Sequence, residues 1–138
     1  MLTKEQKEKQ YKLSEYTWLG KELDSKLAEL ESWRSRLTSV TTKYSDMPSG
    51  NFKEDQMSEG VSTIIDIENE LNESIRKLKE KRDWIYTCIN DVEDSLQRCI
   101  LRQRYIENMK FEELAFRNNM SWRHMHRVHA EALNSIKI

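Results

Sequence analysis

Aliphatic residues recur at every seventh position through the middle of this chain, and that period limits the fold more than any other feature. The residues on this step are Ile64, Leu71, Leu78, Ile85 and Val92. Ile75 and Ile89 add an interleaved set, which Arg82 interrupts. Such a repeat predicts an α-helix, spanning about residues 58–90, that buries one stripe of side chains against another helix as a coiled coil does.

A second amphipathic helix is predicted over residues from about 4 to 40. Its apolar positions follow steps of three and four, at Leu23, Leu27, Leu30, Trp33 and Leu37. Lys–Glu alternation over the first ten residues predicts a solvated end. A linker near 38–58 joins the two helices and contains Pro48-Ser49-Gly50-Asn51, which breaks a helix. The partner of the second helix is either the first helix, folded back as a hairpin, or a second subunit, and the sequence leaves both open.

Composition favours the all-α class. Of 138 residues, 34% are charged, and the chain has only 3 glycines and 1 proline, a mixture typical of long, solvated helices. We therefore expect a helical arm over residues 1–90, formed as a hairpin or coiled coil, and a three-helix domain over residues 91–138. The charged start and the lack of a long apolar run predict a cytoplasmic protein without a membrane partner.

Residues 111–128, FEELAFRNNMSWRHMHRV, have the pattern of a helix-turn-helix. The first helix is expected over residues 111–118, with Leu114 and Ala115 facing inward. Asn118-Asn119 then supplies the turn, because asparagine tolerates the left-handed backbone well. Ser121 is the expected N-cap of the next helix. Met125 and Val128 follow at helical spacing and are expected to pack back onto the first helix.

The second of these helices has a basic face without acidic residues. The residues expected to bind DNA are Lys110, Arg117, Ser121, Trp122, Arg123, His124, His126 and Arg127. Arg123 and Arg127 lie four residues apart and are the expected base readers, since arginine can bond to guanine bidentately. Arg98 is a further candidate for a phosphate contact, whereas Arg104 is expected to pair with a glutamate. The alternative is an ordinary solvated helix face.

The three histidines, His124, His126 and His129, also raise the question of a metal site. Their spacings of two and three do not place all three on one helix face, so neither a metal nor another cofactor is expected. If they are protonated at lower pH, they should strengthen DNA binding. The sequence has no Gly-rich phosphate loop or nucleophile motif, so we expect no enzymatic activity.

Residues 101–133, LRQRYIENMKFEELAFRNNMSWRHMHRVHAEAL, resemble region 4 of the bacterial sigma-70 family. The loop YSDMPSGNF and the helix IIDIENELNESIRKLKEKRDWI extend the resemblance to small phage regulators of the ArpU/RinA type. This resemblance implies a phage or prophage transcriptional regulator that binds double-stranded DNA in the cytoplasm of a bacterial host. In region 4 a Leu-Gly pair usually closes the first helix, whereas this chain has Asn118-Asn119.

Two other functions fit the same pattern. A DNA-packaging factor similar to a terminase small subunit also joins a helix-turn-helix to oligomerising helices, and a ring of subunits would favour it. A module that docks on RNA polymerase is the other, because sigma region 4 contacts the polymerase. A homodimer formed through the helical arm is compatible with the regulator.

Overall fold

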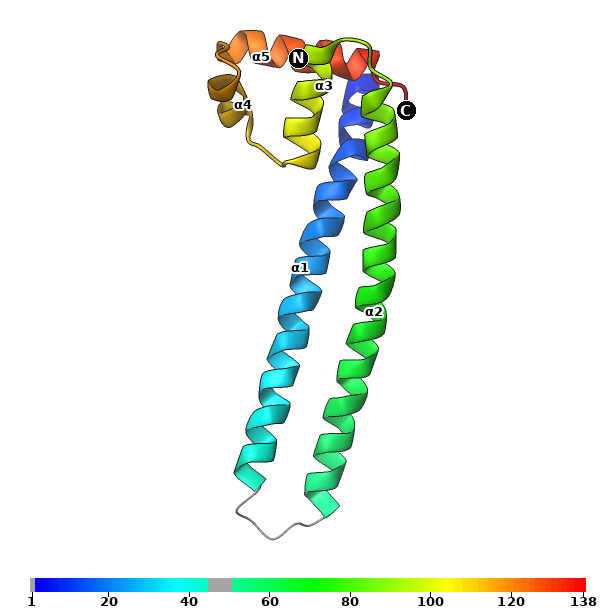
Figure 1. Ribbon diagram of the computed structural model, residues 1–138, viewed down its shortest axis with the longest axis vertical. Helices are drawn as coiled ribbons and strands as arrows, with labels where there is room; N and C mark the ends of the chain where they lie inside the picture. Colours follow the sequence, from blue (N-terminus) through cyan, green and yellow to red (C-terminus); the bar gives the residue numbers. More distant parts are fainter. Residues whose placement is uncertain (1, 45–50) are drawn as a thin grey trace. The chain divides into compact units, whose positions relative to one another are not determined.

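The computed structural model describes residues 2–44 and 51–138, and the described residues form helices and no strand. The helices in chain order are α1 (Lys4–Tyr44), α2 (Asn51–Asn90), α3 (Ser95–Leu101), a π-helical segment (Arg102–Ile106), α4 (Phe111–Arg117) and α5 (Trp122–Ser135) (Figure 1). The predicted all-α class with long N-terminal helices is therefore confirmed. None of the described helices has both the length and the apolar character that a membrane span needs.

Both long helices extend into the stretch that we expected to be a linker. α1 continues to Tyr44 and α2 already begins at Asn51, so most of residues 38–58 is helical. The predicted break at Pro48 lies outside the described residues. The prediction placed too much weight on polar composition, because Lys, Glu and Gln, which dominate residues 53–56, are good helix formers even without an apolar stripe.

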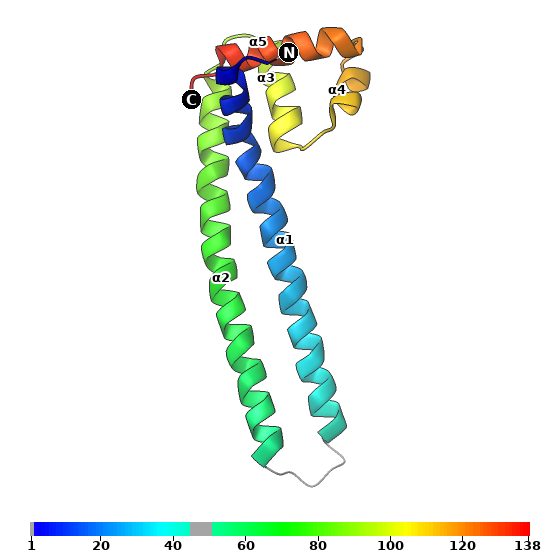
Figure 2. The same cartoon turned by 180° about the vertical axis from the view of Figure 1, so that it is seen from behind.

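Residues 21–77 form one compact unit, which we call the hairpin unit. Within it, α1 and α2 lie side by side and run in opposite directions, as both views show (Figures 1 and 2). The first helix therefore folds back along its own chain. The small core of this unit consists of Leu30, Ile67 and Leu71, with Leu23, Trp33 and Ile64 partly buried against it.

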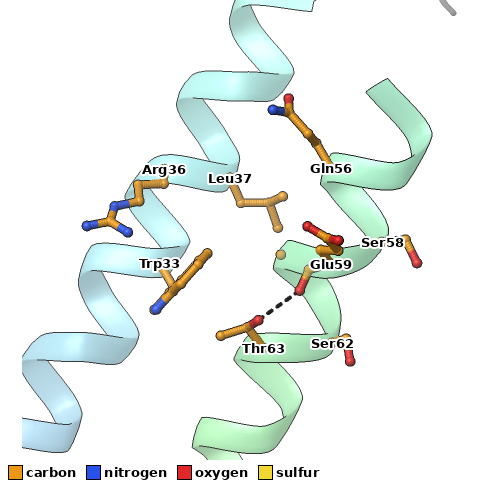
Figure 3. A pocket seen from close by; sticks show the side chains of 9 residues that line it. Trp33, Arg36, Leu37, Gln56, Ser58, Glu59, Ser62 and Thr63 are labelled. Atoms are coloured by element: carbon orange, nitrogen blue, oxygen red, sulfur yellow. Dashed lines mark hydrogen bonds between the residues drawn. The ribbon is translucent and has the colours of Figure 1, made fainter. Parts of the chain in front are cut away.

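The two helices of the hairpin approach closely near Gly60. A Cβ atom at Gly60 would lie 3.1 Å from Cδ1 of Leu37, so the missing side chain makes room for that leucine. Figure 3 shows Leu37 and Trp33 of α1 directed toward this part of α2. The hollow around them is also lined by polar side chains such as Thr63, whose hydroxyl donates to the carbonyl of Glu59 at 2.9 Å.

The predicted apolar stripes are wrong at two positions. Leu27 and Ile75 are about half exposed, at 45% and 49%. Their neighbours Lys26 and Ser74 lie between the helices instead, where Lys26 Nζ donates to Ser74 Oγ at 2.8 Å. Hydrophobicity alone favoured the aliphatic residues, but at this level the residue one position earlier on each helix occupies the seam, and this hydrogen bond satisfies the two polar side chains.

Residues 1–20 and 78–138 form the second unit, which we call the helix-turn-helix unit. The larger of its cores contains Leu13, Ile85, Cys88, Ile89, Val92, Leu101, Tyr105, Ala132, Leu133 and Ile136. The smaller contains Ile100, Met109, Leu114, Ala115, Met125 and Val128. This division differs from the expected boundary after residue 90, because the ends of both long helices supply apolar surface that so small a C-terminal domain needs.

Candidate nucleic-acid interface

The turn between α4 and α5 has the predicted geometry. Leu114 and Ala115 of α4 are buried. Asn118 then donates from Nδ2 to the carbonyl of Leu114 at 2.7 Å and to Oε1 of Gln103 at 2.8 Å. Asn119 adopts the left-handed conformation with φ 53°. The side chain of Asn118 thus ties the turn to the preceding helices, at the position where the sigma-type pattern has an apolar residue.

α5 begins at the predicted cap. The hydroxyl of Ser121 accepts a hydrogen bond from the amide of His124 at 3.1 Å. Met125 and Val128 face inward and pack with Leu114 of α4, as expected. Because one side of α5 is fixed in this core, its opposite side is presented to solvent.

The exposed side of α5 is basic. Arg123 and Arg127 are both exposed, and Trp122 is 53% exposed. The sequence has no Asp or Glu from Arg117 to Ala130. A helical step of four residues places the two arginines together, on the side opposite the core. Three side chains of this face, Trp122, Arg123 and Arg127, line a hollow with Leu2, His126 and Ala130.

The remaining predicted contacts are divided between exposed and partly buried positions. Lys110 and Arg117, at the two ends of α4, are exposed, and so is Ser121. His124 is partly buried and accepts a hydrogen bond at Nδ1 from Arg127 Nη2 at 2.7 Å. This bond orients the guanidinium of Arg127 along α5.

His126 does not point freely outward, contrary to expectation. Its ring centroid lies 4.8 Å from that of Phe111 and 4.3 Å from that of Trp122. Its Nε2 atom is buried and has no hydrogen-bond partner among the described residues. His126 therefore supports the exposed Trp122 by ring packing, which a helical period by itself does not reveal.

His129 is buried in the core, with 1% of its surface exposed. Its Nε2 atom and the hydroxyl of Tyr105 form a hydrogen bond of 2.7 Å. Burial lowers the pKa of His129 to about 4, and the positive charge of Arg104 and the proximity of His126 act in the same direction. The expectation that all three histidines add positive charge for DNA at mildly acidic pH is thus wrong for His129.

Two arginines that precede α4 have structural partners. Arg104 Nη1 donates to the carbonyl of Met109 at 2.8 Å, and its guanidinium lies 4.0 Å from the ring centroid of Phe111. Arg104 therefore has a structural role as expected, but through these contacts and not through the expected glutamate. Arg98 Nη1 donates to the carbonyls of Val92 and Glu93 at 2.6 and 2.8 Å, which occupies the group that we considered for phosphate.

A family model described as a protein of unknown function, DUF1492, matches residues 36–137. The chain belongs to the DUF1492 family. No curated protein and no solved structure matches the chain. In this DUF1492 protein the matched stretch includes the whole of α4 and α5.

The first turns of α1, which precede the matched stretch, contact α5 in a way that we did not predict. Gln6 is buried and donates from Nε2 to the carbonyl of Ala130 at 3.1 Å and to Oδ1 of Asn134 at 2.9 Å. Lys9 Nζ donates to the carbonyls of Leu133 and Ile136 at 3.0 and 2.8 Å. The predicted solvated end is therefore wrong for these residues, which hold the C-terminal half of α5.

One signal in the sequence pointed to an ordered start of α1. Thr3 and Gln6 form a capping box, in which the amide of Gln6 donates to Thr3 Oγ1 at 3.2 Å and the amide of Thr3 donates to Gln6 Oε1 at 2.8 Å. The spacing Thr-x-x-Gln is the usual sequence of this cap. It predicts the beginning of the helix but not the surface on which that helix packs.

Proposed function

We propose that this protein is a sequence-specific regulator of transcription that binds double-stranded DNA with α5 in the major groove. The observation that carries the proposal is the exposed face of α5, where Arg123 and Arg127 lie together opposite the core. The resemblance to sigma region 4 and to ArpU/RinA-type phage regulators supports this function and a phage or prophage origin. The proposal includes no catalytic step.

Each group on the face has a role in the proposal. Arg123 and Arg127 read base edges, because a guanidinium can donate two hydrogen bonds to guanine. The exposed indole of Trp122 packs on a sugar or on a thymine methyl. Lys110, Arg117 and the hydroxyl of Ser121 contact phosphates, which set the position of the helix but carry no sequence information.

The test is selection of bound duplexes from a random DNA pool. The unsubstituted chain should enrich one motif. Arg123→Ala or Arg127→Ala should weaken binding to that motif by about 1–3 kcal/mol and relax the base preference locally. A matched control is Lys12→Ala, which removes an exposed charge from α1 and should leave the motif and the affinity unchanged.

Arg117→Ala gives a comparison within the same experiment. Loss of a phosphate contact should weaken all sequences equally and reduce the salt dependence by about one unit of slope. If no motif is enriched, or if Arg123→Ala and Arg127→Ala behave as Arg117→Ala does, direct base reading by α5 is refuted.

A further inference from the structure

Four large aliphatic side chains of the hairpin unit are exposed to solvent. The exposed fractions are 45% for Leu27, 44% for Val61, 50% for Ile65 and 49% for Ile75. Single exposed aliphatic residues are normal on a protein surface. A group of them along one side of a helical hairpin is different, because together they present apolar surface that a partner can cover.

An ion pair shows that these residues share one side of the hairpin. Arg34 of α1 and Glu68 of α2 are joined at 2.7 Å. Leu27 precedes Arg34 by seven residues, and Ile75 follows Glu68 by seven. Because the helices run in opposite directions, the step back along α1 and the step forward along α2 cover the same distance toward the same end of the hairpin. Leu27 and Ile75 therefore lie opposite each other on the two helices, one heptad away from the ion pair.

The other two exposed residues lie on the same side of the hairpin, but beyond the ion pair from Leu27 and Ile75. Val61 precedes Glu68 by seven residues, and Ile65 is one helical turn after Val61. The side of the hairpin thus has apolar residues, then the ion pair, then apolar residues again. We call this surface the 27/75 flank, defined by Leu27, Arg34, Val61, Ile65, Glu68 and Ile75.

The core of the hairpin unit leaves this flank without cover in a single chain. Leu30, Ile67 and Leu71 are its only buried apolar side chains among the described residues. Two helices have only one seam between them, whereas a four-helix bundle buries a second stripe on every helix. A second hairpin is the simplest element that covers a flank of this length.

We propose that the 27/75 flank is a two-fold interface between two copies of this chain. Charge selects the arrangement of the two hairpins. A two-fold axis parallel to the helices places α1 opposite α2 of the second copy, so that Arg34 faces the Glu68 of that copy. Hairpins packed face to face in opposite directions would place Arg34 on Arg34, which is unfavourable.

The same axis makes the apolar layers self-complementary. Leu27 meets the Ile75 of the second copy and Ile75 meets its Leu27, while the Val61 and Ile65 side chains extend the contact beyond the ion pairs. An interface between two identical surfaces of this kind forms a closed dimer. The partner is therefore a second copy, and the ion pairs set its orientation.

The mass of the full chain in solution, measured by light scattering at micromolar concentration, is the first test. We expect twice the chain mass of 16.6 kDa for the unsubstituted protein and the single-chain mass for Ile75→Lys. Asn69→Lys is the matched control, because Asn69 is an exposed residue of α2 outside the flank. That variant should remain a dimer. A monomeric unsubstituted chain, or an Ile75→Lys dimer, would overturn the proposal.

Charge exchange tests whether the charges of the flank pair between the two chains. Arg34→Glu makes both positions of the ion pair acidic, and Glu68→Arg makes both basic, so each variant alone should be a monomer. Mixed in equal amounts, they should form a dimer, since only contacts between chains then have opposite charges. Circular dichroism should show that both variants stay helical, because an exposed ion pair contributes little to folding.

A mixture that remains monomeric, or single variants that remain dimers, would refute the cross-chain pairing. These measurements use no DNA. Their outcome is therefore independent of whether α5 binds DNA.

Discussion

The buried histidine makes a sharp prediction for the dependence of stability on pH. His129 is neutral in the folded protein, because burial lowers its pKa to about 4. In the unfolded chain its pKa is about 6.5. Protonation therefore favours the unfolded state, and the stability that depends on neutral His129 is fully present above about pH 6.5. It is lost progressively as the pH falls toward about 4.

The size of the effect follows from the difference between the two pKa values. Each pKa unit corresponds to about 1.36 kcal/mol, so the loss should reach about 3 kcal/mol near pH 4 and then stay constant. With a urea dependence of about 1–3 kcal/mol per molar for a small protein, the unfolding midpoint should fall by roughly 1–3 M. The hydrogen bond to Tyr105 gives the histidine a partner in the neutral form.

Urea unfolding followed by circular dichroism between pH 7.5 and 4 measures this loss. Carboxylates also titrate in this range, so the informative quantity is the difference between the unsubstituted chain and His129→Gln. Glutamine retains a hydrogen-bonding group for Tyr105 but does not titrate. The matched control is His124→Gln on the outer part of α5, which should retain the full dependence. Equal pH dependence in the unsubstituted chain and in His129→Gln would refute the assignment.

Two further predictions concern helix ends and glycines. Lys9→Met should destabilise the helix-turn-helix unit by about 1–2 kcal/mol, because the last carbonyls of α5 lose a cationic partner. Faster amide hydrogen exchange should appear first in the last turn of α5. Unchanged exchange there would contradict the contact. Gly20→Ala should raise the free energy of unfolding by about 1 kcal/mol, since the new Cβ meets nothing within 4 Å. In Gly60→Ala this gain should be reduced or reversed, because the new Cβ would lie 3.1 Å from Leu37, and thermal unfolding of the two variants compares them directly.

Local features of the sequence were sufficient for most of the proposed interface, with His126 and His129 as the exceptions. The turn at Asn119 and the cap at Ser121 involve residues within three positions of one another, so composition and spacing predict them. The inward side of α5 follows from Met125 and Val128 at helical spacing, and the outward side, with Arg123, follows from the same period. DNA binding itself stays a prediction.

The sequence by itself thus determined the helical class, the long α2 and the turn, cap and faces of α4 and α5, because these depend on short-range spacing and helical period. Only the tertiary structure decided which side chains meet. Lys26 and Ser74 lie in the seam in place of Leu27 and Ile75 because the register of two paired helices depends on both at once. Gln6 bonds to Ala130, 124 residues away, and no local pattern relates positions that folding alone brings together.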